Sequence, residues 1–156
     1  MKRVYIETTI PSVYFETRRT TQASLWRQIT RDWWSAAKST FQLVTSEFVV
    51  DEIARGPADK AEQCLELLSG VETLERASGF ETVVAEYVRR KVMPVDSLGD
   101  AAHLAMASTH GIEFLLTWNF RHLANANKAQ HIRIVNQSLG LAVPVIASPL
   151  TLGAEG

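Results

Sequence analysis

Three carboxylates and one carboxamide lie at positions in the sequence where they could share a chemical task. In chain order they are Glu7, Glu52, Asp100 and Asn119. If the fold gathers the acids, each like-charged pair at ~4 Å costs about 4 kcal/mol at an effective dielectric of ~20, so the cluster takes up protons or binds a cation. Oxygen ligands without cysteine suit Mg²⁺ or Mn²⁺. Because such an ion promotes attack of water on phosphodiesters, these residues predict hydrolysis of a nucleic-acid backbone.

Short apolar runs alternate with helical stretches along the chain, and this alternation decides where the four side chains lie. Strands separated by helices form a parallel sheet with helices on both faces. Ligands bind such sheets beyond the carboxyl ends of the strands, and Glu7 and Asn119 are predicted to lie there. Ser46 is the expected N-cap of the helix that carries Glu52. The predicted strands are 3–7, 41–45, 71–75, 112–117 and 132–135, and the predicted helices are 17–38, 46–56, 58–70, 80–92, 95–111 and 119–128.

The bulk properties favour one soluble globular domain. The chain has 156 residues, 46% of them hydrophobic, and its 16 Lys and Arg against 17 Asp and Glu leave a net charge of −1. One domain over residues 1–150 is expected, with 151–156 as a mobile tail. Cys64 is the single cysteine, which excludes an internal disulfide and a cysteine-based zinc site. Because no signal-peptide pattern and no apolar run of ~18–20 residues is present, we expect a cytoplasmic protein without membrane contact.

Four short motifs, taken in order, resemble those of the PIN-domain nucleases, the family of the VapC toxins of bacterial and archaeal toxin–antitoxin pairs. They are VYIETTIPS around Glu7, TSEFVVDEI around Glu52, GDAAHLAMAS around Asp100 and LLTWNFRHL around Asn119. The resemblance covers nearly the whole chain and implies a three-layer α/β/α sandwich with a central parallel sheet of four to five strands. It also implies an Mg²⁺- or Mn²⁺-dependent endoribonuclease that acts on RNA, forms a homodimer and is restrained by an antitoxin protein. By this resemblance Glu7, Glu52 and Asp100 would be metal ligands, and Asn119 would occupy the fourth acidic position.

Two of these positions depart from the family pattern. The family usually has Asp where this chain has Glu7, whose extra methylene shifts the carboxylate oxygens. The fourth acid is commonly Asp, whereas Asn119 brings an amide without charge, which lowers the predicted metal affinity. We hypothesise that Asp96, one helical turn before Asp100, restores the missing charge.

Each acid also has an ordinary structural explanation. Glu7 alone would be explained by a strand end whose side chain points to water. Glu52 could form an ion pair with Arg55. Asp100 follows Ser97 at the spacing of a capping box, with Asp in place of the usual Glu. Only the combination of the acids and their motifs favours a shared site.

Several neighbours of the acids are candidates for accessory roles. Thr8 is expected to bond a carboxylate or a metal-bound water, or to close the turn after the first strand. His103 is expected to make a structural hydrogen bond, with a ligand or general-base role as the alternative. Arg121 and His122 follow the carboxamide and are expected to contact the phosphates of an RNA substrate.

The stretch 17–38 carries a surplus of basic and aromatic side chains. Arg27 and Arg31 share a helical face, which either binds RNA phosphates or is simply solvated. Trp33 and Trp34 are adjacent, so the helix is expected to direct only one of them inward. This aromatic surplus adds to the expectation of a homodimer.

Two other functions compete with the nuclease. A degenerate member of the same family would bind RNA or a protein partner without cleaving, and the uncharged Asn119 favours it. A small α/β phosphatase has less support, because the sequence shows no aspartyl-nucleophile motif and no Gly-rich phosphate loop. The sequence therefore predicts a metal-dependent ribonuclease, the toxin of an antitoxin-controlled pair.

Overall fold

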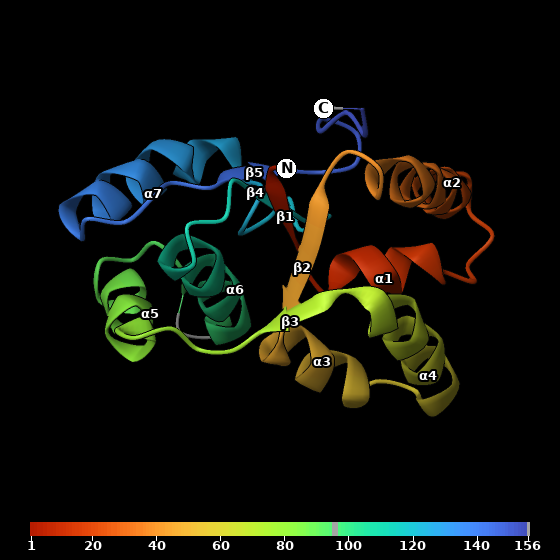
Figure 1. Ribbon diagram of the computed structural model, residues 1–156, viewed down its shortest axis with the longest axis horizontal. Helices are drawn as coiled ribbons and strands as arrows, with labels where there is room; N and C mark the ends of the chain where they lie inside the picture. Colours follow the sequence, from red (N-terminus) through yellow and green to blue (C-terminus); the bar gives the residue numbers. More distant parts are fainter. Residues whose placement is uncertain (95–96, 156) are drawn as a thin grey trace.

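The structure is a computed structural model that describes residues 1–94 and 97–155. Within these ranges five strands form one sheet in the order β3-β2-β1-β4-β5, and every neighbouring pair is parallel. Helices α5, α6 and α7 lie on one side of the sheet, and α1, α2 and α4 lie on the other (Figure 1). This arrangement confirms the predicted α/β class and its helix-covered parallel sheet. The elements are β1 (Arg3–Ile6), α1 (Thr9–Tyr14), α2 (Thr21–Ala37), β2 (Gln42–Ser46), α3 (Glu47–Ala54), α4 (Ala58–Leu67), the 3₁₀ turn η1 (Leu68–Gly70), β3 (Glu72–Leu74), α5 (Phe80–Arg89), α6 (Leu98–Thr109), β4 (Phe114–Leu116), α7 (Ala126–Ser138) and β5 (Val145–Ala147).

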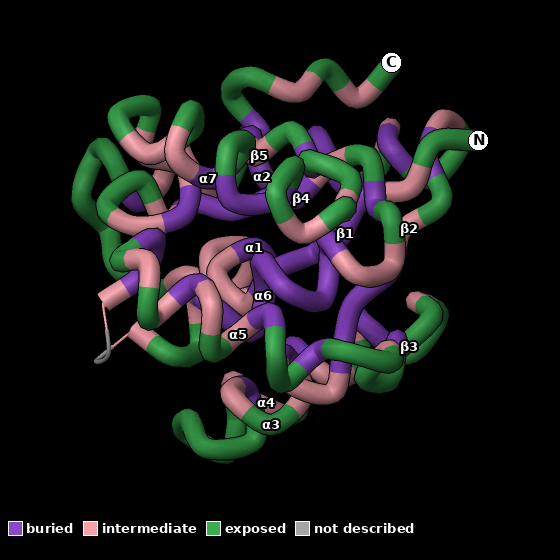
Figure 2. The backbone as a smooth tube through the Cα atoms, turned by 90° about the vertical axis from the view of Figure 1, so that its left-hand side faces the viewer, coloured by how far each residue is buried: buried purple, intermediate pink, exposed green. Residues whose placement is uncertain are grey.

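β1 is the central strand of the sheet and is deeply buried. Its residues Val4, Tyr5 and Ile6 are shielded from solvent, and Val4 lies opposite Leu43 of β2 and Phe114 of β4. A strand covered on both faces needs apolar side chains at successive positions, not at alternate ones. The unbroken run VYI is therefore what a central strand requires, and the buried part of the tube in Figure 2 follows the strands through the middle of the molecule.

The helix α1 is absent from the predicted elements, although it directly follows the first acid. Pro11 is its third residue, a position that a first helical turn tolerates because the N–H there has no intrahelical partner. The backbone oxygen of Glu7 accepts the N–H of Ile10 at 3.0 Å, which closes the turn from β1 into the helix. α1 packs against α2 and α4, and its first residue, Thr9, lies beside the end of β1.

The end of the chain differs from the prediction. The segment 132–135, predicted as a strand, belongs to α7, where Ile132 and Val135 are buried at helical spacing and Ile134 is 48% exposed. α7 begins after Asn125, whose side chain accepts the N–H of Asn127, so the helix predicted at 119–128 is also wrong. The fifth strand is β5, at the edge of the sheet and directly after Pro144, a place where the missing proline N–H breaks no ladder hydrogen bond.

Both adjacent tryptophans of α2 are buried, so the expectation that only one of them faces inward is wrong. Trp33 stacks on Phe41 and donates its indole N–H to the backbone oxygen of Leu152 at 2.9 Å. Trp34 packs edge-on against the ring of Tyr14 in α1. The helix is covered on two sides, because the end of the chain lies over it in addition to α1 (Figure 1).

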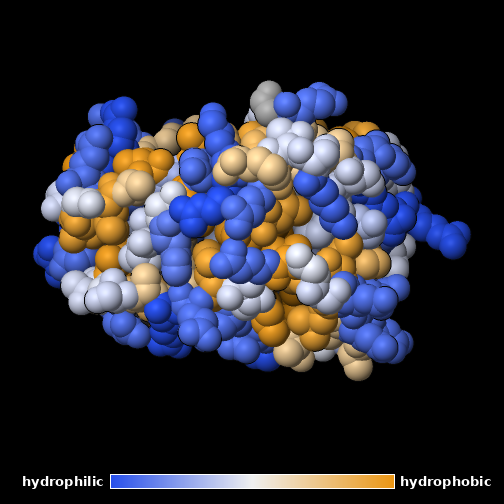
Figure 3. Space-filling model, in the orientation of Figure 1, coloured by the Kyte–Doolittle hydropathy of each residue, from blue (hydrophilic) through white to orange (hydrophobic). Residues whose placement is uncertain are grey.

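The surface shows no long apolar helix. No helix in the described ranges is both long and apolar enough to cross a lipid bilayer. On the face shown in Figure 3, apolar residues gather near the middle, and polar residues surround them.

Leu25 of α2 is 55% exposed, whereas Trp33 and Trp34 are core residues. The homodimer therefore stays a prediction of the resemblance, because most of the aromatic side chains invoked for it are used inside the molecule.

Candidate active site

Glu7 lies at the carboxyl end of β1 and is only 3% exposed, so a solvated strand end is excluded. Its Oε1 accepts hydrogen bonds from Thr117 Oγ1 at 2.6 Å and from both the backbone N–H and the hydroxyl of Thr9. Thr117 follows β4, the parallel neighbour of β1, so two adjacent strand ends build this contact. Burial raises the pKa of Glu7, while the charge of His103 and the threonine hydrogen bonds oppose the shift.

Glu52 points from α3 to His103 on α6, and not to Arg55. Glu52 Oε1 lies 2.5 Å from His103 Nε2, whereas Arg55 bonds a backbone oxygen of its own helix. His103 is 1% exposed, and its Nδ1 lies 2.7 Å from the Tyr5 hydroxyl. That hydroxyl lies 2.6 Å from Ser46 Oγ. A continuous hydrogen-bonded chain, Ser46–Tyr5–His103–Glu52, therefore joins β2, β1, α6 and α3.

The protons of this chain can be placed in two ways, and Ser46, the predicted N-cap, accepts two backbone N–H groups of α3 in both. If His103 is neutral, Ser46 donates to the Tyr5 hydroxyl, Tyr5 donates to His103 Nδ1, and Nε2–H donates to Glu52. If the ring carries both protons, Nδ1–H donates to Tyr5, Tyr5 donates to Ser46, and Nε2–H still donates to Glu52. Burial lowers the pKa of His103, but the Glu52 hydrogen bond and the charges of three carboxylates outweigh burial and raise it. Burial also works to raise the pKa of Glu52, but the hydrogen bond and charge of His103 outweigh it and lower that pKa.

Asp100 lies in the first turn of α6 and is held by Asn119 from the loop after β4. Asn119 Nδ2 donates to Asp100 Oδ1 at 3.1 Å, and Asn119 Oδ1 accepts the backbone N–H of His122 at 3.1 Å. Because a carboxylate only accepts and an N–H only donates, these partners define the orientation of the amide. A carboxylate in place of Asn119 would repel Asp100, so the departure from the family pattern creates a hydrogen bond.

All three carboxylates lie close enough to His103 for their charges to raise its pKa, and Glu52 bonds it directly. Asn119 also donates its backbone N–H to Thr117 Oγ1 at 2.9 Å, and the same hydroxyl donates to Glu7, which links the first and third acids. The first turn of α6 lies directly on Glu52, because a Cβ placed on Gly99 would lie 3.5 Å from Glu52 Oε1. Burial raises the pKa of Asp100, while the charges of His103 and His122 and the Asn119 hydrogen bond oppose the shift.

The accessory candidates lie at or near this group. Thr8 and Glu52 line one pocket; the Thr8 hydroxyl is close enough to lower the pKa of Glu52, but its buried oxygen makes no hydrogen bond of ordinary geometry. His122 Nδ1 is buried without a hydrogen-bond partner in the described part of the chain. Arg121 is exposed. Asp96 lies outside the described residues, so its predicted compensating role stays a prediction.

Two structural alternatives from the sequence do not survive. Ser97 is the N-cap of α6 but makes no side-chain capping bond, so the capping box does not explain Asp100. Arg27 donates to the backbone oxygen of Glu16 at 2.7 Å, and Arg31 donates to that of Tyr14 at 2.8 Å. Both arginines therefore bind the backbone around the end of α1, so the helical face that they share is not simply solvated.

The carboxylates suit a hard cation in kind, although they are not a ready-made cage. Among the described residues, no three His, Cys, Asp or Glu side chains form a metal-binding group as they stand. The hydrogen bonds given above all go to one oxygen of each acid, so Glu7 Oε2, Glu52 Oε2 and Asp100 Oδ2 are left for another partner. Three carboxylate oxygens are the donor type that Mg²⁺ and Mn²⁺ prefer.

Three residues of the site were not identifiable by type and spacing alone. Thr9 and Thr117 hold Glu7, and Tyr5 holds His103. A tyrosine inside an apolar strand and a threonine at the end of another are the signals in the sequence, but such residues are common in strands. Thr117 and Tyr5 act on partners 110 and 98 positions away along the chain, whereas Thr9 lies two positions from Glu7.

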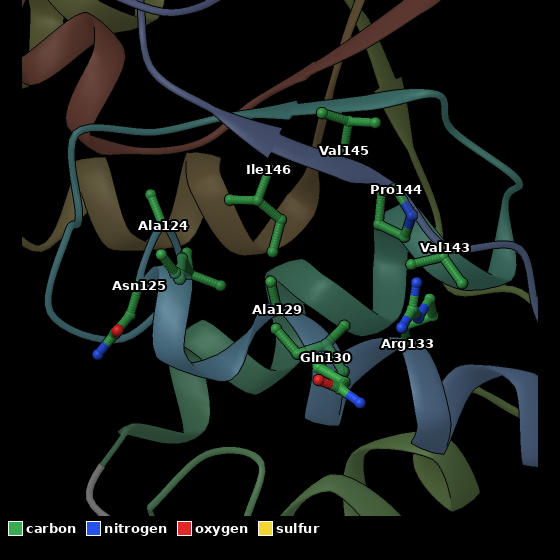
Figure 4. Close-up of a pocket in the computed structure, with 12 residues that line it drawn as sticks. Ala124, Asn125, Ala129, Gln130, Arg133, Val143, Pro144, Val145 and Ile146 are labelled. Atoms are coloured by element: carbon green, nitrogen blue, oxygen red, sulfur yellow. The ribbon is translucent and has the colours of Figure 1, made fainter.

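Another cavity lies elsewhere, and no acid is among the residues that line it. It has a volume of about 580 Å³ and lies between α7 and β5, with Arg133 and Gln130 among its polar residues and Val143 and Ile146 among its apolar ones (Figure 4). Without carboxylates it offers no ligands for a hard cation. The acid cluster at the carboxyl ends of β1 and β4 is therefore the candidate active site.

Comparison with known proteins shows the fold. No protein-family model matches the sequence, and no curated protein matches it either. A solved structure described as VapBC2 from Rickettsia felis bound to a DNA fragment from their promoter matches with a TM-score of 0.56 and 12% sequence identity. The match covers 94% of this chain and 98% of that one. At this identity the likeness shows a shared PIN-like α/β fold, which confirms the predicted architecture.

Proposed function

We propose that this protein is a metal-dependent endoribonuclease that hydrolyses RNA phosphodiester bonds, and that it is the toxin of a toxin–antitoxin pair. One observation carries the proposal. The charges of Glu7, Glu52 and Asp100 all act on the buried ring of His103, and the hydrogen bonds described above go to one oxygen of each acid. The likeness of the fold to VapBC2 supports the same class.

Glu7, Glu52 and Asp100 would hold Mg²⁺ or Mn²⁺, and a bound ion supplies charge stabilisation and activated water for phosphodiester hydrolysis. The protein's own contribution is orientation. Thr9 and Thr117 hold the carboxylate of Glu7, and the other two acids have their own partners, described above. Such supporting contacts keep ligands in a productive geometry. Arg121 and His122, next to Asn119, are proposed to contact the phosphates of the RNA.

Calorimetric titration with Mn²⁺, run beside an RNA-cleavage assay in the same buffer, tests this function. Asp100→Asn keeps an oxygen that can accept from Asn119 but removes the charge, so we expect it to lose both Mn²⁺ binding and cleavage. Asp32→Asn is the matched control, because Asp32 is an exposed residue of α2 and its variant should behave as the wild type. A wild type that binds no Mn²⁺ at millimolar concentration and cuts no RNA would refute the proposal.

A second candidate is a module that binds RNA or a protein partner without cleaving. Two observations favour it: Asn119 brings no charge, and the buried ring of His103 lies among the three carboxylates and can offset part of their charge without a metal. In the same experiment this candidate predicts neither Mn²⁺ uptake nor cleavage, and it predicts RNA or partner binding in a separate binding assay.

The proposed cellular setting follows from the toxin role. We propose a cytoplasmic protein whose partners are an RNA substrate, a cognate antitoxin and a second copy of the chain. A small reading frame directly upstream of the gene, whose product binds this chain and suppresses its cleavage of RNA, is the expected finding. An isolated gene whose product cleaves RNA would instead favour a housekeeping nuclease.

A further inference from the structure

A second, smaller pocket is lined in part by Glu52. It has a volume of about 150 Å³ and lies between α1, α3 and α4. Its polar lining consists of Thr8, which directly precedes α1, Ser12 from α1, Glu52 from α3 and Lys60 from α4. At ~30 Å³ for each water molecule, this volume holds about five waters, enough for a phosphate group and too little for a large organic cofactor.

The polar groups of this pocket are unusually free. The Thr8 oxygen is buried and makes no hydrogen bond of ordinary geometry, although buried polar atoms nearly always have partners. Lys60 is half-buried and forms no ion pair within the described part of the chain, although it lies close enough to Glu16 to help lower the pKa of that carboxyl. By contrast, Arg18 pairs with Glu16, and Arg27 and Arg31 bond backbone oxygens. A hydroxyl without a hydrogen bond of ordinary geometry and an ammonium without an ion pair are suited to a ligand that accepts hydrogen bonds and carries negative charge.

The charge around the pocket also suits an anion. Glu52 is the acid that lines it, and Glu52 is hydrogen-bonded to the buried ring of His103. Lys60 lies close enough to Cys64, at the apolar end of the pocket, to oppose the rise in the thiol's pKa that burial causes. Glu52 is compensated by its partner, and Lys60 supplies the positive charge among the residues that line the pocket.

We propose that this pocket is an RNA-backbone subsite, in which Lys60 and the hydroxyls of Thr8 and Ser12 hold a phosphate next to the one that is cleaved. The subsite rests on the proposed ribonuclease function, because Glu52 would then belong both to the metal site and to the edge of the pocket. A strand of RNA that places one phosphate at the three carboxylates can place a neighbouring phosphate beside Lys60. Base identity plays no part in such a contact, because phosphates position the nucleic acid and carry no sequence information.

The test measures binding of a short fluorescein-labelled single-stranded RNA to the full chain by anisotropy, in EDTA and over a series of salt concentrations. Lys60→Gln should weaken binding several-fold and reduce the slope of log Kobs against log salt by about 0.7, the value for one phosphate contact to a single strand. Lys60→Arg should restore most of the loss. Lys2→Gln is the matched control. It removes the same charge, and Lys2 precedes β1, at the end of the strand opposite to the one that Glu7 follows.

Thr8→Val gives a second, independent measurement. Because the Thr8 oxygen makes no hydrogen bond of ordinary geometry in the free protein, the variant should change its Tm little while RNA binding weakens. The subsite is overturned if Lys60→Gln and Lys2→Gln bind RNA equally well at every salt concentration, or if the wild type binds no RNA. A wild type that binds RNA through Lys60 but never cleaves it with Mn²⁺ overturns the nuclease function and retains the subsite.

Discussion

Asn119→Asp would return a carboxylate to the position where the family resemblance places one, and the structure determines the cost. The substitution removes the bond from Asn119 Nδ2 to Asp100 Oδ1, and hydrogen bonds to charged groups contribute about 1.5–3 kcal/mol. It also sets two carboxylates side by side, a repulsion of up to about 4 kcal/mol at ~4 Å and an effective dielectric of ~20. Proton uptake by the pair relieves part of this repulsion. We therefore expect the free energy of unfolding of Asn119→Asp to be lower than that of the wild type by about 3 kcal/mol near neutral pH without metal.

The pH dependence of this variant has a definite sign. Each acid of the pair raises the pKa of the other, so the folded state holds a proton that the unfolded state releases. Stability therefore falls as pH rises from the unfolded-state value of ~3.9 toward the raised folded-state pKa. The loss of stability of Asn119→Asp relative to the wild type should be smallest near the acid end of that pH window. Mn²⁺ should act in the opposite direction, because a ligand at about 100 times its Kd returns about 2.7 kcal/mol to the folded state.

Urea denaturation of Asn119→Asp and the wild type, in EDTA and in Mn²⁺, at about pH 5 and about pH 7, measures these effects. Asn127→Asp is the control, since Asn127 lies exposed in the first turn of α7, where a carboxylate is tolerated or mildly favourable. If Asn119→Asp unfolds at the wild-type urea concentration in EDTA near neutral pH, Asn119 does not orient Asp100, and the reasoning is refuted.

Three further predictions concern the buried acids and the chain that ends on Glu52. Tyr5→Phe leaves His103 Nδ1 without its partner and should cost about 1–3 kcal/mol of stability, measured by urea denaturation; an unchanged midpoint would contradict the hydrogen-bonded chain. The pKa of His103 is raised in the folded protein, so its stabilising contribution is complete below the unfolded-state pKa of ~6.5 and is lost as pH rises through the folded-state pKa. His103→Gln should remove this loss from the profile of stability against pH. A variant whose profile matches that of the wild type would contradict the prediction. Because burial raises the pKa of Glu7, Glu7→Gln should be at least as stable as the wild type near neutral pH and should lose Mn²⁺ binding by calorimetry; a variant that binds Mn²⁺ normally would remove Glu7 from the metal site.

Local patterns were sufficient for the parts of the fold that neighbouring residues specify. The run VYI predicts a strand buried on both faces, and β1 lies at the centre of the sheet. Ser46 predicts a helix start, and α3 begins directly after it. Where a local pattern allowed two structures, the prediction was wrong: 132–135 is apolar enough for a strand but lies in α7, because Ile132 and Val135 face the core at helical spacing.

The sequence by itself determined that acids follow strands of a parallel sheet, and topology then places such strand ends at one edge. It could not show which groups bond those acids. Tyr5 and His103 are 98 residues apart, and Glu7 and Thr117 are 110 residues apart. Such partners meet only because the sheet order sets β1 between β2 and β4 and packs α6 over the same edge. The tertiary structure therefore decided that His103 lies between the carboxylates, and that Asn119 supplies a hydrogen bond where a further acid would have supplied repulsion.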